Sequence, residues 1–379
     1  MNISLLFEKL NLNDLHLENR IVMAPMTRAK APENTPNNDT SDYYELRAKG
    51  GVGLIISEGS YINLHASETG FSDPGMVPHF FGSKALSGWE NVVDAVHKHG
   101  TKFIPQLWHV GSVRQTGMSP EPNKSGFGPS AVLNPNPGAS KGDLPQVMTE
   151  QDIENIINDY TNAAVAAKNI GCDGIELHGA HGYLIDQFFW DYTNKRSDVY
   201  GGSLAARTKF ACDIVKSIRS KVGNEFPIGL RYSQWKIGAY DAKIAHNPQE
   251  LEDFLLPLVN AGVDLFHCST RNFSKPEFEG SHLNLAGWTK KITGKTVITV
   301  GSVGANMDFV DNYLGKKSND DSNLLSALNL LCQQLENKEV DLVAIGRALI
   351  ADPAFTNKIK QHRFTDIISY TPEMLESYP

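Results

Sequence analysis

Cysteine is scarce in this chain of 379 residues, and the placement of its cysteines argues against two kinds of stabilisation. The four cysteines are Cys172, Cys212, Cys268 and Cys332, and no two of them form a Cys-x-x-Cys pair. Disulfide-rich scaffolds and structural zinc sites bring cysteines together at short, regular spacings. We therefore expect reduced, mostly buried thiols rather than a disulfide framework or a zinc framework.

Long apolar runs and an excess of positive charge are also missing. No hydrophobic stretch approaches the length that spans a bilayer, and residues 1–9 lack the basic-then-apolar order of a signal peptide. The formal net charge of -8 offers no basic field for nucleic acid or anionic lipid, although it does not exclude a local phosphate pocket. We expect a cytoplasmic protein with no nucleic-acid or membrane partner, and either a monomer or a homodimer.

The apolar segments that are present recur in a regular alternation with helix-like stretches. A content of 41% hydrophobic and 21% charged residues is typical of a globular protein, and the length suits either two average domains or one large barrel. The predicted strands, each followed by glycine, polar or charged residues, are 21–24, 53–57, 102–108, 174–177, 227–231, 263–267, 296–300 and 341–345.

This alternation predicts a (β/α)8 TIM barrel, in the α/β class, as one domain over residues 1–379, with its site at the carboxyl ends of the strands. Residues 11–18 alternate leucine with polar residues and predict a hairpin that closes the bottom of the barrel. Residues 111–148 are too long for a passive connection, so a lid or small subdomain is expected after the third strand. Residues 306–335 hold two helical stretches around the polar segment 315–322. A doubly wound open sheet is the alternative, but no Gly-x-Gly-x-x-Gly follows the first strand.

The central strand ends in a dense group of polar residues. His178 stands at its end, and His181 and Tyr183 follow, with glycines at 179 and 182 that allow sharp turns. Two imidazole N–H groups could hold a carbonyl oxygen while the Tyr183 hydroxyl supplies a proton. His-x-x-His is also a metal spacing, which only Glu176 or Asp186 could complete locally, and buried structural histidines are a second alternative.

Other predicted strand ends carry side chains suited to a flat heterocycle. Pro25 stops the first strand and leaves Thr27 at its carboxyl end, where the hydroxyl could equally satisfy local backbone. Gly59 after the second strand would allow a flat ligand to approach closely. Gln106 and Trp108 share one side of the third strand, and an amide both donates to and accepts from an imide edge.

Three further strand ends suggest an anion. Arg231 closes the fifth strand, where a buried guanidinium is costly unless it meets an anion or an electron-rich ring. The seventh and eighth strands end at Gly301-Ser302 and Gly346-Arg347, the usual phosphate position in a (β/α)8 barrel.

Taken together, these motifs resemble the Old Yellow Enzyme family of flavin-dependent ene-reductases over nearly the whole chain. Each motif alone is weak, whereas their order and placement are specific. The motifs are residues 24–28 (APMTR), 106–108 (QLW), 176–184 (ELHGAHGYL), 194–196 (NKR), 200–203 (YGGS) and 346–349 (GRAL).

The resemblance implies that FMN is held noncovalently across the barrel mouth. By similarity, the phosphate would lie on Gly301, Ser302, Gly346 and Arg347. The isoalloxazine would lie over Pro25, Met26, Thr27 and Gly59, with Gln106 at its pyrimidine edge, Arg231 near N1 and O2, and Thr27 at O4.

The resemblance also implies a reaction in two halves at one site. NAD(P)H would reduce FMN and leave, and an α,β-unsaturated carbonyl or similar activated alkene would then receive hydride at its β-carbon. His178 and His181 would bind the carbonyl oxygen, Tyr183 would protonate the α-carbon, and Trp108 and Phe71 would shape the substrate pocket.

The chain departs from many relatives at two places, and three other functions compete. Many relatives carry asparagine at the position of His181. They also have Ser-Pro after the arginine, where this chain has residues 232–235 (YSQW) after Arg231. The competing functions are a related flavin barrel acting on nitro compounds or dienoyl thioesters, a non-catalytic flavin-binding protein, which would not need Tyr183, and a zinc hydrolase.

Overall fold

Eight parallel strands close into a barrel in the computed structural model of the chain, which describes residues 2–68, 70, 72–303 and 322–378. The strands follow one another around the barrel in sequence order, and the last pairs with the first. They are β3 (Ile21–Met23), β4 (Leu54–Tyr61), β5 (Lys102–Trp108), β8 (Ile175–His181), β9 (Ile228–Lys236), β10 (Leu265–Ser269), β11 (Thr296–Val300) and β12 (Leu342–Ile345). The predicted (β/α)8 architecture is confirmed.

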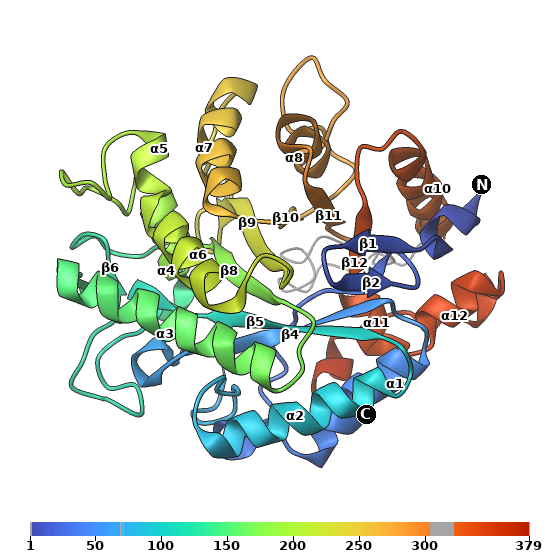
Figure 1. Ribbon diagram of the computed structural model, residues 1–379, viewed down its shortest axis with the longest axis horizontal. Helices are drawn as coiled ribbons and strands as arrows, with labels where there is room; N and C mark the ends of the chain where they lie inside the picture. Colours follow the sequence, from blue (N-terminus) through green and yellow to red (C-terminus); the bar gives the residue numbers. More distant parts are fainter. Residues whose placement is uncertain (1, 69, 71, 304–321, 379) are drawn as a thin grey trace.

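Helices form an outer ring around these strands (Figure 1). The long ones are α1 (Asn38–Lys49), α2 (Ser83–His97), α3 (Glu150–Asn169), α6 (Lys209–Val222), α7 (Pro248–Ala261), α8 (Leu285–Thr293) and α10 (Ser322–Glu336). The short ones are α4 (Leu184–Phe189), α5 (Leu204–Arg207), α11 (Arg347–Ala351) and α12 (Phe355–Lys360). None of the helices among the described residues has the length and apolar character needed to cross a membrane.

Capping explains where two of these helices begin. Thr149 accepts a hydrogen bond from the backbone N–H of Asp152, whose carboxylate accepts from the N–H of Thr149, so α3 starts at Glu150. Asn37 and Thr40 form the same reciprocal cap before α1. The helix therefore includes the polar residues 38–40.

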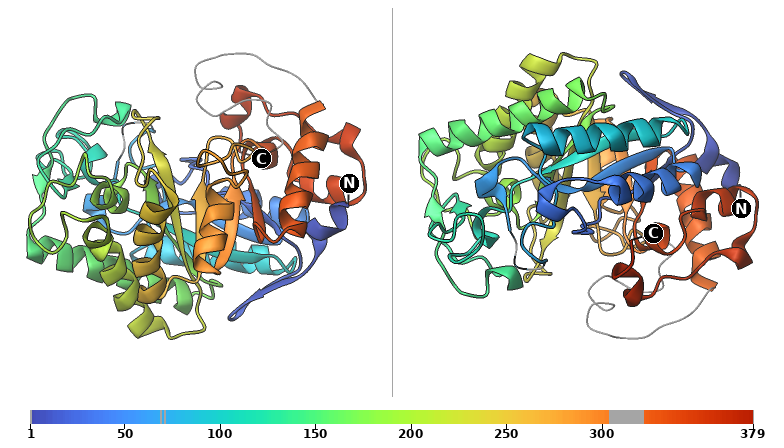
Figure 2. Two further views of the ribbon diagram at one scale, coloured as in Figure 1. Left: turned by 90° about the horizontal axis from the view of Figure 1, so that it is seen from above. Right: turned by 90° about the horizontal axis from the view of Figure 1, so that it is seen from below.

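The lower half of the barrel interior is filled by aliphatic side chains and sealed by a hairpin. The hairpin pairs β1 (Leu10–Leu12) with β2 (Leu15–Leu17) in antiparallel register. Leu15 and Leu17 are fully buried against residues that point into the barrel, including Val22, Leu54 and Leu265. Burying one such side chain contributes about 1.5–3 kcal/mol. Figure 2 shows this hairpin at the opposite end of the barrel from the C-terminal segment, as predicted for a bottom closure.

The long connection after β5 is a small subdomain, as predicted. It contains a two-stranded sheet of β6 (Phe127–Gly128) and β7 (Gln146–Val147) and two short 3-10 turns. Arg114 is fully buried in it, and its guanidinium donates to four backbone carbonyls and so ties the subdomain together. The four carbonyls belong to Ser67, Met118, Ser119 and Glu121.

Four strands, β4, β8, β9 and β10, run further than their apolar segments predicted. β8 continues beyond residue 177 and β9 beyond Arg231, and they remain paired as far as His181 opposite Lys236, with an irregularity after Gly179. The added residues are largely polar and lie at the top of the barrel, so hydrophobicity ends before the hydrogen-bonded ladder does. The predicted helical stretches within 306–335 are described only from residue 322 onward, where α10 lies; residues 304–321 are outside the described part.

Candidate active site

A cavity of about 570 Å³ lies at the carboxyl ends of the barrel strands. Its volume is within the range of small-molecule sites, and its wall contains most of the site residues predicted from the sequence. Those that line it are Pro25, Met26, Thr27, Gln106, Trp108, His178, His181, Tyr183, Arg231, Gly301, Ser302, Gly346 and Arg347.

Two predicted residues are not part of this wall as described. Gly59 lies in β4 opposite Gln106, and a Cβ atom added there would stand 2.6 Å from Cε3 of Trp108. Its missing side chain therefore makes room for an indole that itself lines the cavity, in place of the expected direct approach by a ligand. Phe71 is outside the described residues.

The two predicted histidines converge on the cavity from β8. His178 is the register partner of Arg231 on β9, and its ring meets that of His181 edge-on with centroids 5.2 Å apart. The ring of His181 stacks on Trp235 at 4.5 Å. Burial, and then the charge of Arg231, hold the pKa values of both histidines well below the usual range. Both imidazoles are therefore neutral near pH 7.

The hydrogen bonds around this pair leave imidazole N–H groups available to a ligand. Nε2 of His181 lies 2.8 Å from Oγ of Ser269, which accepts from Nη2 of Arg231 at 3.3 Å. The Ser269 hydroxyl can then donate its proton to Nε2 of His181. In that tautomer, the imidazole carries its own hydrogen on Nδ1. Nδ1 of His178 is buried and has no hydrogen-bond partner in the described part of the chain.

Tyr183 completes the polar group with a buried phenol. Its ring stands edge-on to Trp108 at 4.8 Å and to His178 at 5.0 Å. Burial raises the pKa of Tyr183 well above its usual value, opposed only in part by the side chain of Asn136. The phenol therefore stays protonated throughout the physiological pH range and can donate to a group bound beside it.

A buried polar layer lies beneath the cavity, and the sequence reasoning missed most of it. Glu176 accepts from Nε2 of Gln106 at 2.8 Å with one oxygen, and its other oxygen lies 2.7 Å from Nδ1 of His267. Burial lowers the pKa of Arg231, and the charge of Glu176 opposes that shift. Glu176 had been weighed only as a metal ligand, and these contacts occupy both of its oxygens. Alternation along β8 would have placed it on the same face as His178.

The strand ends after β11 and β12 form a cradle of small residues. These strands are neighbours, so Gly301 and Gly346 lie side by side at the cavity wall. Gly301 has a φ of +145°, and a Cβ atom there would be 2.7 Å from the carbonyl oxygen of Thr270. Arg271 and Arg347 line the same cavity. Small residues beside cationic side chains suit a phosphate.

The remaining wall comes from residues that were not among the predicted site residues. Trp235 and Ile237 follow from the extension of β9, and others come from the end of β10, from the barrel strands β11 and β12, and from the C-terminal tail. Arg28 holds this tail, because its Nη2 donates to the carbonyl oxygen of Ser377 at 2.6 Å. The other newly found lining residues include Ser269, Thr270, Arg271, Tyr370, Pro372 and Leu375.

The chemistry of this wall fits FMN. The cradle of small residues and Arg347 suit its phosphate, and Gln106 presents an amide to a heterocycle edge. Nε of Arg231 is buried without a hydrogen-bond partner among the residues that the structure describes. A buried cation with an unused donor is stabilised by an anionic or electron-rich group, and a flavin ring is such a group.

Comparisons with known proteins agree with this reading of the cavity. The model of the NADH:flavin oxidoreductase / NADH oxidase family matches residues 5–318. An NADH oxidase from Thermoanaerobacter brockii is 33% identical over 371 residues, which cover 96% of this chain and 52% of that protein. This chain thus spans about half the length of that relative. A putative 12-oxophytodienoate reductase 2 from Oryza sativa subsp. japonica is 28% identical over 375 residues, covering 97% of this chain and 91% of that protein.

Solved structures give the same result. The structure of morphinone reductase in complex with tetrahydroNAD has a TM-score of 0.79 and 27% identity, and the match covers 98% of this chain and 93% of that chain. An old yellow enzyme homologue from Zymomonas mobilis, at 22% identity, supports the fold with a TM-score of 0.76 over 99% of both chains. The chain belongs to the NADH:flavin oxidoreductase / NADH oxidase family of FMN-dependent oxidoreductases, the family of the old yellow enzymes.

Proposed function

We propose that this chain is an NAD(P)H-dependent ene-reductase that binds FMN noncovalently and reduces α,β-unsaturated carbonyls or similar activated alkenes. One observation carries the proposal: two neutral imidazoles and a protonated phenol meet at one cavity wall, with centroids 5.0–5.2 Å apart. When bound, FMN supplies the hydride chemistry, taking electrons from NAD(P)H and delivering them to the alkene.

The histidine pair binds and polarises the substrate. N–H groups of His178 and His181 donate to the carbonyl oxygen, which gains negative charge as the β-carbon accepts hydride. Donors that are fixed before the reaction stabilise that charge without reorganising. Because burial and Arg231 keep both rings neutral, the pair does not pay the repulsion of two adjacent imidazoliums.

Tyr183 supplies the proton that completes the reduction. Its hydroxyl donates to the α-carbon, and its raised pKa keeps the acid form populated at neutral pH. The edge-on contacts with Trp108 and His178 restrict the ring to one orientation, which keeps the donor in place between turnovers.

The residues around Arg231 set the electrostatics of the cofactor position. Arg231 places a positive charge in a buried wall, where it favours an electron-rich ring, and Glu176 helps to keep that charge. Glu176 also holds Gln106 at 2.8 Å, so the amide is oriented before a ligand binds. On this proposal, Gly301, Ser302, Gly346 and Arg347 hold the phosphate by hydrogen bonds and charge alone.

The reducing nicotinamide is proposed to use the same cavity as the alkene. The morphinone reductase structure contains tetrahydroNAD, and its fold covers nearly all of this chain, which supports a shared site and two successive half-reactions. Anaerobic titration of the FMN-loaded protein with NADH and with NADPH distinguishes the two reductants.

The test is a purified protein and a two-substrate assay. The preparation should be yellow or become yellow with added FMN, and it should oxidise NADH or NADPH faster when cyclohexenone is supplied. A colourless protein that does not take up FMN would refute the proposal.

The same assay separates the alternatives. Turnover of nitro compounds or dienoyl thioesters without turnover of enones would indicate the related flavin barrel. FMN binding without oxidation of either nicotinamide would indicate a non-catalytic flavin protein.

A further inference from the structure

The segment that carries His181 and Tyr183 has a strained backbone. His181 has a φ of +66°, in the left-handed region, and Gly182 after it has a φ of +84°. Glycine adopts this region freely, but a residue with a Cβ atom such as histidine does so only when its surroundings impose it. Something in the structure must therefore hold residue 181 in place.

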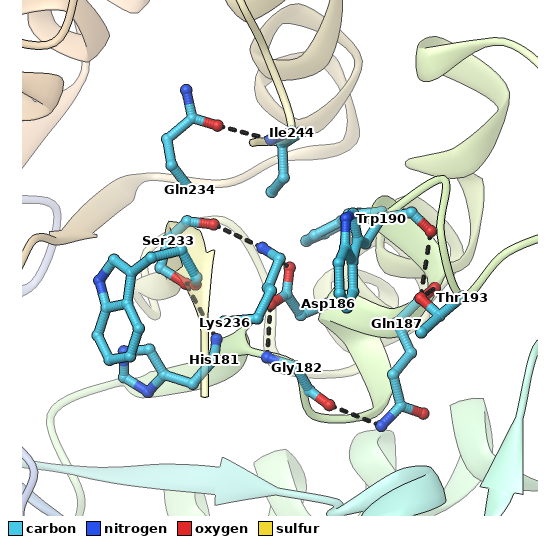
Figure 3. A network of polar contacts seen from close by, with 12 residues as sticks. His181, Gly182, Asp186, Gln187, Trp190, Thr193, Ser233, Gln234, Lys236 and Ile244 are labelled. Atoms are coloured by element: carbon cyan, nitrogen blue, oxygen red, sulfur yellow. Dashed lines mark hydrogen bonds and ion pairs between the residues drawn. The ribbon is translucent and has the colours of Figure 1, made fainter. Parts of the chain in front are cut away.

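A buried network behind the segment supplies that restraint (Figure 3). The hydroxyl Oγ of Ser233 accepts from the backbone N–H of His181 at 3.0 Å. The carboxylate of Asp186, from α4, accepts from the N–H of Gly182 at 2.7 Å. Nζ of Lys236 joins the two sides, because it donates to Asp186 at 2.7 Å and to the carbonyl oxygen of Ser233 at 2.8 Å.

We propose that the Lys236–Asp186 ion pair, together with Ser233, is a positioning device that holds His181 in its left-handed conformation and so aims its imidazole at the substrate oxygen. Neither charged side chain is part of the cavity wall, and both are fully buried. They act through the backbone of residues 181 and 182. The inference rests on the proposed function only in assuming that His178 and His181 bind that oxygen.

The energetics favour positioning over simple stabilisation. Burying two charges costs desolvation that their attraction often fails to offset, and apolar pairs of similar volume are frequently as stable. This ion pair instead links β9 to α4 across the segment that bears His181 and Tyr183. Its lysine is available because β9 continues past Arg231 to Lys236, the residue paired with His181.

The first test uses the double variant Lys236→Met/Asp186→Asn. It removes one charge of each sign, so the net charge near the cavity is unchanged, and the asparagine oxygen can still accept from Gly182. The probe is 4-chlorophenol, titrated into the FMN-loaded protein and followed by its long-wavelength absorbance, because a phenolate oxygen should occupy the substrate-oxygen position. Freeing residue 181 from an imposed left-handed conformation should weaken binding by about five- to thirtyfold.

A matched control exists at the other end of the barrel. Lys290 donates to Asp341 at 2.8 Å, and that carboxylate also accepts from the N–H of Val297, so the groups are the same, although this pair is partly exposed and remote from the cavity. The double variant Lys290→Met/Asp341→Asn should bind 4-chlorophenol within about twofold of the parent. An equal loss of affinity in both double variants would show a general effect of removing ion pairs and would overturn the inference.

A milder variant covers the case in which the first one fails to fold. Ser233→Ala leaves the ion pair intact and removes only the hydroxyl that holds the N–H of His181. It should also weaken 4-chlorophenol binding, and parent-like affinity would overturn the inference. If the parent itself gives no absorbance change with the phenol, the proposed function fails. If the parent binds it and the variants bind equally well, only the positioning role fails.

Discussion

Replacing Tyr183 with phenylalanine should separate the two halves of the proposed reaction. The substitution removes one hydroxyl and keeps the ring, so the edge-on contacts with Trp108 at 4.8 Å and His178 at 5.0 Å remain. Reduction of bound FMN by NADH or NADPH requires no proton from this residue. Protonation of the alkene α-carbon does, and only that half should slow.

The size of the effect follows from the role of a general acid. A positioned proton donor contributes about 10²- to 10⁴-fold, so alkene reduction in Tyr183→Phe should slow by that factor. Because burial raises the pKa of Tyr183 above its usual value, the parent should show no loss of this step from tyrosine ionisation up to about pH 10. The cost in stability should be small, about 1 kcal/mol or less, since one hydroxyl is lost.

The assay is anaerobic stopped-flow absorbance, with each half-reaction measured separately. Tyr192→Phe is the matched control, because Tyr192 is exposed and is not part of the cavity wall, and both of its half-reactions should match the parent. Equal slowing of both halves in Tyr183→Phe, or an alkene step that keeps the parent rate, would contradict the assigned role.

Three further predictions concern the histidines and the tail. Replacing His178 and His181 together by alanine should weaken 4-chlorophenol binding at least tenfold, since two hydrogen bonds are lost; unchanged titrations would count against the anchoring pair. Because burial lowers the pKa of His181, this residue is protonated in the unfolded state below about pH 6.5 while it is still neutral in the folded state. Protonation then favours the unfolded state, so the protein loses stability as the pH falls. Between about pH 7.5 and 5.5, the free energy of unfolding measured in urea should therefore fall by about 1.4 kcal/mol less in His181→Asn than in the parent. Equal falls in both proteins would argue against a buried neutral ring. In Arg28→Met, the tail loses its hydrogen bonds to the carbonyls of Leu375 and Ser377, so limited proteolysis of residues 364–378 should be on the order of tenfold faster; an unchanged rate would show that other contacts hold the tail.

The sequence by itself determined the barrel and the centre of the site. Apolar periodicity is a local property, so eight strand segments could be recognised without any tertiary information. Parallel strands all end at the same edge of a barrel, which is why His178, Arg231 and Gly301 could be expected to meet although they lie far apart in the chain. The motifs at these strand ends also carried the resemblance to the family.

Only the tertiary structure decided how these residues are held. Lys236 reaches Asp186 across 50 residues of sequence, and Glu176 reaches His267 across 91, and no local pattern indicates such partners. The same is true of the tail that Arg28 ties back to the cavity, and of Gly59, whose missing side chain accommodates Trp108. Hydrophobic periodicity specifies which face of a strand is buried, whereas the pairing of buried polar groups depends on distances that exist only once the barrel has closed.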